Sequence, residues 1–184
     1  MRSAAAQLEV IGIRSKSQST AIILSTVPLC QWFGPGSIDG QVQFSQAVPQ
    51  GPTTIQVSLK NLASIAGGYH VHVLPLKPGS ASPCSNADIL GHFNPLAWNV
   101  SNSPSPGVGT VDQYEVGDIS GKFGMLTLKD IYEGVHEDPS MPLTGPYSIV
   151  GRSLVIHHTN STSCGVKGLK ILQISDNCSG IHLY

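Results

Sequence analysis

Charged residues are scarce in this sequence, and neither sign dominates. They make up 11% of the 184 residues, and the formal net charge is -1. Without an excess of Lys and Arg, the chain has no basic field for nucleic acid or for an anionic membrane surface. Apolar runs are also short, because none reaches the roughly eighteen residues needed to span a bilayer. We therefore expect no nucleic-acid partner and no membrane span.

The sequence also lacks a CxxC pair, which argues against a zinc knuckle. Its four cysteines are an even number and favour disulfides, although four cysteines allow three pairings. These cysteines are Cys30, Cys84, Cys164 and Cys178. Three acceptor sequons for N-glycosylation begin at Asn99, Asn160 and Asn177. Cysteines and sequons together predict a secreted, extracellular glycoprotein with disulfide bonds.

The first residues lack the compact apolar core of a signal peptide. Residues 1–19 are polar and mixed, so we expect a leader or linker there. One domain is predicted over residues 20–175, followed by a C-terminal tail over residues 176–184. No repeat is visible inside the chain. The whole could itself be one repeat of a longer protein, with neighbouring repeats as partners.

Glycine and proline, in contrast, are plentiful, with 20 and 13 residues scattered through runs rich in Val and Ile. This composition predicts an all-β domain of many short strands. Apolar and polar residues alternate most clearly in 40–46, 53–62 and 148–157, which predicts half-buried strands. Further strands are expected at 21–33, 69–73, 121–128, near Ile131 and at 164–174. The stretches 75–118 and 133–146 are predicted to be long loops. The predicted strands number about eight and would form a sandwich or flattened barrel.

Two histidines stand at i and i+2 in the segment Tyr69-His70-Val71-His72-Val73. In a strand both imidazoles point the same way, and the intervening side chains point to the core. One reading is a half-exposed strand with two solvated histidines. The other is a metal site, since two neutral imidazoles on one face can hold a single ion.

Further motifs accompany this strand in a fixed order. They are Gly91-His92-Phe93-Asn94-Pro95, Val116-Gly117-Asp118 and the run from Gly151 to His157 with the sequence GRSLVIH. Together with the histidine strand, the chain over residues 20–175 resembles the copper/zinc superoxide dismutase family. The resemblance implies an eight-stranded Greek-key β-barrel with one copper ion on its outer face. The implied copper ligands and catalytic residues are His70, His72, His92 and His157.

Imidazole nitrogens suit Cu(II), which prefers a tetragonal arrangement, and they can still hold Cu(I). The resemblance thus implies an oxidoreductase, a superoxide dismutase, that converts superoxide to O₂ and H₂O₂ by cycling copper. His157 faces away from Leu154 and Ile156 if residues 148–157 form a strand, as an outer-face ligand must.

The sequence departs from the family where zinc would bind. Asp118 matches the zinc aspartate, but Glu115 stands where a second zinc histidine would precede it, and no histidine lies between Phe93 and His136. With two of three zinc imidazoles missing, a tetrahedral zinc site is not expected, and the chain resembles the copper-only branch. We expect the Glu115 carboxylate to orient His92 instead, and Asp118 to hold Glu115, backbone amides or its loop. The alternative for both acids is a solvated turn.

A second departure concerns the docking of the anionic substrate. Family members carry an arginine three residues before the conserved cysteine, and here Ser161 stands at that position. A fixed cation beside the metal attracts a small anion, so its loss could slow turnover. A copper-binding or structural module with little turnover is therefore a rival to the enzyme. An immunoglobulin-type adhesion sandwich would leave the ordered histidines unexplained.

The same resemblance implies a pairing of the cysteines. Cys84 and Cys164 match the family's disulfide within one subunit, which would leave Cys30 to pair with Cys178. A bridge that closes a loop of about 80 residues constrains the unfolded chain by roughly 4 to 5 kcal/mol.

Overall fold

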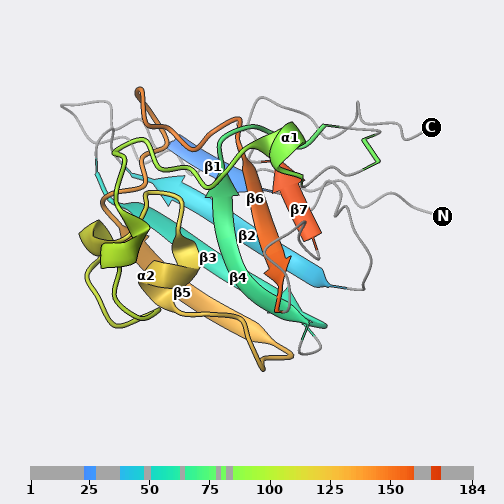
Figure 1. Ribbon diagram of the computed structural model, residues 1–184. Coiled ribbons are helices and arrows are strands. Elements are labelled where there is room, and N and C mark those ends of the chain that lie inside the picture. Colours follow the sequence, from blue (N-terminus) through green and yellow to red (C-terminus); the bar gives the residue numbers. More distant parts are fainter. Residues whose placement is uncertain are drawn as a thin grey trace, which may run out of the picture.

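The computed structural model describes residues 23–27, 38–47, 51–62, 65–77, 80–81, 85–159 and 167–170, the first and last of these by their backbone. Seven strands in this part form two antiparallel sheets, which agrees with the predicted all-β sandwich of about eight strands in class though not in the strand count of the described residues (Figure 1). One sheet has the order β1-β2-β3-β5 and the other β4-β6-β7. The strands are β1 Ile23–Val27, β2 Asp39–Gln46, β3 Thr53–Lys60, β4 Ala66–His72, β5 Tyr132–Asp138, β6 Ser153–His158 and β7 Lys167–Lys170.

The larger sheet follows the predicted alternation. Val42 pairs with Val57, and Phe44 with Ile55, across β2 and β3. All four side chains are buried, whereas the residues between them are exposed or half-buried. The pleat directs alternate side chains to one face, so this face supplies one wall of the core.

The second sheet closes the core from the other side. Tyr69 and Val71 of β4 pair with Ile156 and Leu154 of β6, and these four side chains are buried. Val73, the third residue predicted for this face, is partly buried against the same core. Val155 points to the other face, where it packs with Leu76 and Ile89. The alternation therefore places His70, His72 and His157 on the face away from the core.

Three predicted segments are wrong in whole or in part. In the strand predicted over residues 148–157, β6 begins only at Ser153, and residues 148–152 lie outside it. Residues 121–128 do not form a strand, because Ile119–Phe123 is a short helix, α2. Asp118 caps it by accepting a hydrogen bond of 2.6 Å from the Gly121 amide. Residues 133–146 are not a loop throughout, because β5 begins at Tyr132 and pairs with β3 from Thr53 to Leu59.

The predicted long loop is largely correct. Between β4 and α2 the described residues hold one short helix, α1 (Asn86–Ile89), and two 3₁₀ turns at Val100–Asn102 and Val111–Gln113. Two isolated bridges tie this loop to β4, His70 to Asp118 and His72 to His92. The loop thus returns twice to the histidine strand. None of the helices in the described ranges has the length and apolar character to cross a membrane.

A buried ion pair fastens α2 to β5. The Lys122 ammonium donates to Asp138 at 2.7 Å, to the Val116 carbonyl at 2.9 Å and to Ser140 Oγ at 2.9 Å. Both charged side chains are fully enclosed. Burial lowers the pKa of Lys122, and the neighbouring Asp138 opposes that effect. This contact anchors the segment that leads into Asp118.

Candidate metal centre

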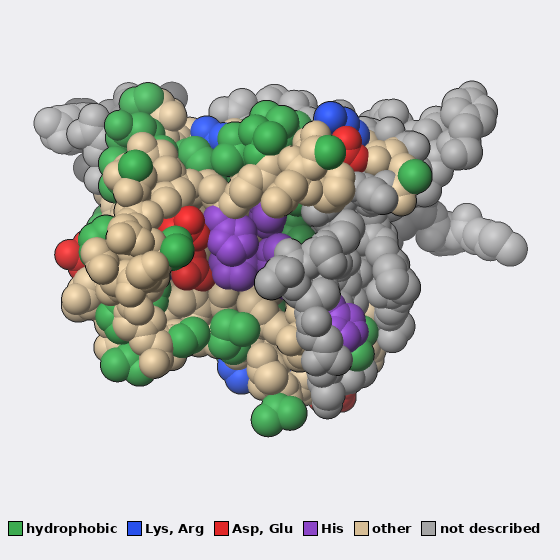
Figure 2. All heavy atoms as spheres, viewed as in Figure 1, with side chains coloured by type: hydrophobic (Ala, Val, Ile, Leu, Met, Phe, Trp, Pro, Cys, Tyr) green, Lys and Arg blue, Asp and Glu red, His purple; other side chains and the backbone are tan. Residues whose placement is uncertain are grey.

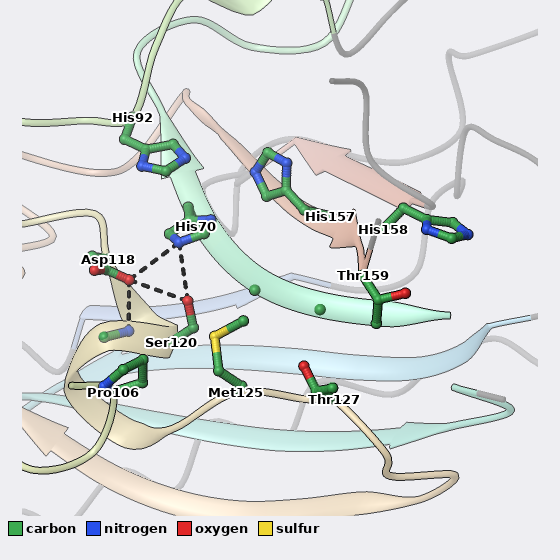
Figure 3. A pocket seen from close by; sticks show the side chains of 13 residues that line it. His70, His92, Pro106, Asp118, Ser120, Met125, Thr127, His157, His158 and Thr159 are labelled. Atoms are coloured by element: carbon green, nitrogen blue, oxygen red, sulfur yellow. Dashed lines mark hydrogen bonds and ion pairs between the residues drawn. The ribbon is translucent and has the colours of Figure 1, made fainter. Parts of the chain in front are cut away.

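Four histidine rings meet beside the open face of β4. His70 and His72 come from β4, His157 from β6, and His92 from the loop that bridges to His72. In Figure 3 the rings of His70, His92 and His157 face a common centre. The His70 and His92 rings stack with centroids 3.9 Å apart, and the His157 centroid lies 4.9 Å from His70.

The His72 ring is oriented by a backbone carbonyl. Its Nδ1 lies 2.9 Å from the Leu90 oxygen, which can only accept, so Nδ1 carries the proton. The Nε2 atom of His72 then presents a lone pair, and it lies 3.1 Å from Nε2 of His157. Two imidazole nitrogens this close can share one proton or one metal ion.

The His92 ring is oriented by Glu115, the residue that the sequence predicts for this role. Its Nδ1 lies 2.9 Å from Glu115 Oε2, with the carboxylate largely enclosed and the imidazole about one-third exposed. A carboxylate accepts the Nδ1 proton and leaves Nε2 of His92 unprotonated.

The His70 ring is held by its Nε2 atom, whereas His72 and His92 are held by Nδ1. Its Nε2 lies 3.2 Å from Asp118 Oδ1 and 3.0 Å from Ser120 Oγ. Nδ1 of His70 is buried and has no hydrogen-bond partner. An unpaired buried polar atom costs free energy, which points to a ligand that satisfies it.

Burial favours the neutral form of the His70, His72 and His157 rings. It lowers the pKa of His72 to about 4 and that of His157 to about 3, and it also lowers the pKa of His70. Neutral imidazole is the form that binds metal ions, so the cluster is ready for a metal at neutral pH. One ligand nitrogen from each of His70, His92 and His157 lies within 4.8 Å of the other two. An all-imidazole set of this size suits copper or another borderline ion.

The two acids predicted near the site both lie beside it. Glu115 contacts His92, and Asp118 accepts from the Gly121 amide, as one of the expected roles requires. Asp118 also reaches His70, a contact that the sequence analysis did not anticipate. Burial alone would raise the pKa of Asp118, but its hydrogen bonds with His70, Gly121 and Ser120 hold it below the ordinary value.

Sequence reasoning missed Ser120. Its hydroxyl is almost fully buried and stands between His70 and Asp118. A serine two residues after an aspartate is common in turns, and only the structure shows that this one reaches the imidazole.

Several predicted residues lie outside the described part of the chain. These are Cys30, Cys84, Cys164, Cys178, Ser161, Asn160 and Asn177. The remaining sequon residue, Asn99, lies within the described part of the chain. It is exposed, and its side chain accepts a hydrogen bond from the Ser101 amide at 3.1 Å.

Arg152 has a structural role on the strand, because it donates a hydrogen bond to the Val73 carbonyl and covers the Phe93 ring.

A cavity of about 430 Å³ opens onto the imidazoles. Its lining includes the backbone of Gly67 and Gly68, and it extends past Met125 toward Thr159. Figure 2 shows histidine rings gathered at one place on this surface, with acidic side chains directly beside them. Among the described residues, no Lys or Arg lines the cavity.

Comparisons with known proteins point to one family. A family model described as copper/zinc superoxide dismutase matches residues 38–168. The chain is 32% identical to a superoxide dismutase [Cu-Zn] of Yarrowia lipolytica over 125 residues, which cover 67% of this chain and 73% of the relative. It is 28% identical to a putative superoxide dismutase [Cu-Zn] of Autographa californica nuclear polyhedrosis virus over 79% of this chain and 87% of that protein.

Solved structures show the same fold. Superoxide Dismutase 5 of Candida albicans, in a Cu(II) form, aligns with a TM-score of 0.63 at 26% identity, covering 85% of this chain and 93% of that one. A variant of the same protein altered at a glutamate aligns with a TM-score of 0.65 at 25% identity, covering 88% and 94%. Since the family model spans most of the sequence and a superoxide dismutase [Cu-Zn] is 32% identical over 67% of the chain, the chain belongs to the copper/zinc superoxide dismutase family.

Proposed function

We propose that this protein is an extracellular copper-only superoxide dismutase. Its copper ligands are His70, His72, His92 and His157. The observation that carries the proposal is the convergence of ring nitrogens from these histidines, above all the buried Nδ1 of His70, which has no hydrogen-bond partner. Copper bound there would alternate between Cu(II) and Cu(I), oxidising one superoxide to O₂ and reducing another to H₂O₂.

The protein's part is to fix the rings. The Leu90 carbonyl and the Glu115 carboxylate each hold an Nδ1 proton, so His72 and His92 offer Nε2. Asp118 holds the opposite nitrogen of His70, so this ring offers Nδ1. Such outer contacts set the tautomer and the direction of a ligand before the metal arrives.

We further propose that the zinc site of the family is not retained. Asp118 already contacts His70 and accepts a hydrogen bond from the Gly121 amide, and Glu115 already contacts His92. With these acids engaged, the described residues on this side offer no set of imidazoles for a tetrahedral ion. Variants of the Candida albicans protein altered at a glutamate and at an aspartate are among the solved structures.

The substrate is superoxide, which reaches the histidines through the open cavity beside them.

We propose that the domain spans residues 20–175 and that the protein is secreted. We also propose that it carries the disulfides Cys84–Cys164 and Cys30–Cys178. Asn99 supports glycosylation, since its side chain is exposed on a surface turn. Residues 1–19 would then be a leader or linker, and residues 176–184 a tail.

The test is superoxide consumption by copper-loaded protein, measured by pulse radiolysis beside a His157→Ala variant. Catalysis in the wild type that disappears in the variant supports the proposal. Copper binding without turnover favours the second candidate, a copper-binding module. The observation that favours this second candidate is that no Lys or Arg is among the described residues that line the cavity, so none of these side chains adds a positive charge to attract an anion.

A further inference from the structure

The hydroxyl of Ser120 lies within hydrogen-bond distance of both a histidine and an aspartate. Its Oγ lies 3.0 Å from Nε2 of His70 and 3.2 Å from Oδ1 of Asp118. Ser120 is 1% exposed, so these contacts are largely shielded from water. Figure 3 shows the three groups joined as a triangle at the wall of the cavity.

The directions of the hydrogen bonds in this triangle are fixed by chemistry. An ionised Asp118 can only accept, so the Ser120 hydroxyl donates to it. The oxygen of Ser120 then has lone pairs free to accept the Nε2 proton of His70, which Asp118 also accepts at a longer 3.2 Å. The proton of His70 is thereby held on Nε2 by two acceptors, and Nδ1 is left bare.

The backbone around the triangle leaves room for it. A Cβ on Gly68 would lie 2.6 Å from Cε1 of His70 and 3.1 Å from the Ser120 oxygen. A Cβ on Gly121 would overlap Asp118 Oδ2. Two glycines therefore let the ring, the hydroxyl and the carboxylate pack together.

We propose that Ser120 is a positioning residue that, with Asp118, holds His70 in the tautomer whose Nδ1 faces the metal ion. This inference rests on the proposed function, since it takes His70 as a copper ligand. Without the hydroxyl, Asp118 would hold the Nε2 proton through its long contact alone. The imidazole could then rotate or exchange its proton with water.

The test compares three variants. Ser120→Ala removes one oxygen atom and little volume. Ser120→Thr restores a hydroxyl at the same place. Ser103→Ala is the matched control, because it removes a hydroxyl bonded at 2.9 Å to the Trp98 indole nitrogen, away from the histidines.

The first readout needs no copper and no turnover. In metal-free protein, imidazole ¹⁵N spectra report the His70 tautomer and the exchange rate of its Nε2 proton. We expect Ser120→Ala to speed exchange roughly fivefold, as the loss of one net hydrogen bond implies. Ser120→Thr should return the rate toward that of the wild type, and Ser103→Ala should leave it unchanged.

The second readout is copper affinity, with the Cu(II) electron paramagnetic resonance spectrum as its signature. Ser120→Ala should bind copper at least about tenfold more weakly, with altered nitrogen splittings. Unchanged exchange and unchanged affinity in Ser120→Ala would overturn the proposal. Equal losses in Ser120→Ala and Ser120→Thr would also overturn it, because they assign the effect to packing. Failure of the wild type to consume superoxide overturns the proposed function, whereas the exchange rate still decides the role of Ser120.

Discussion

Three histidines of the cluster each have one ring nitrogen tied to the protein and the other turned toward the common centre. A different group contacts the held nitrogen of each ring. It is a backbone carbonyl for His72, a glutamate for His92, and an aspartate together with a serine for His70. The alternation of a strand predicts which side a histidine faces, so the sequence located His70, His72 and His157 correctly. Apart from Glu115 as a partner of His92, it could not predict which nitrogen each ring presents, because that depends on partners from distant segments.

Glu115 offers the sharpest test at this scale. Glu115→Ala leaves the Nδ1 proton of His92 without its acceptor, and we expect copper affinity to fall about tenfold. Glu115→Gln keeps an accepting oxygen but loses the charge, so its loss should be smaller. Competition with a copper chelator measures both affinities.

Glu137→Ala is the control, because Glu137 is an exposed carboxylate on β5. The account of His92 is wrong if Glu115→Ala binds copper as tightly as this control.

At the scale of elements, the errors of sequence reading have physical causes. Residues 121–128 carry apolar side chains at strand-like spacing, but Asp118 caps a helical turn over the first of them. In β5 the inward positions are Tyr132, Gly134 and His136, a set with no clear apolar alternation. Pairing with β3 makes this segment a strand, and that partner is distant in sequence.

The buried pair between α2 and β5 yields a second prediction. Lys122→Met leaves the Asp138 carboxylate buried and without its cation, which typically costs about 3 to 5 kcal/mol. We therefore expect a large drop in the free energy of unfolding, measured by urea denaturation of the metal-free protein. Adding Asp138→Asn removes the uncompensated charge and should recover part of the loss.

Lys60→Met is the matched control for this pair. Lys60 contacts Asp39 at 3.1 Å, but both side chains are more than half exposed, so little change is expected. Equal effects of Lys122→Met and Lys60→Met would show that the enclosed pair does not hold α2 in place.

For the whole molecule, the histidine cluster makes the metal-free fold sensitive to acid. The pKa values of His72 and His157 are near 4 and 3 when folded and return to about 6.5 on unfolding. As the pH falls below 6.5, the unfolded chain takes up protons before the folded one, so stability falls until the folded-state pKa values are reached. Above pH 6.5 this contribution is fully present.

Urea denaturation between pH 7 and pH 4 checks this dependence on metal-free protein. We expect a loss of at most about 1.4 kcal/mol per pH unit for each of these histidines. His157→Asn removes one titrating ring and should flatten the slope. A wild-type stability that stays constant over this range would contradict the burial of the rings.

The whole molecule places this cluster on the outer face of one sheet, beside a cavity and against two acids that are already engaged. This arrangement predicts a single copper ion per chain and no zinc site. The most direct test is metal analysis of the purified protein after dialysis against equal concentrations of both ions. We predict one copper per chain, bound at a site that His157→Ala weakens, and no stoichiometric zinc. Stoichiometric zinc beside copper, or copper bound equally well by His157→Ala, would contradict the account.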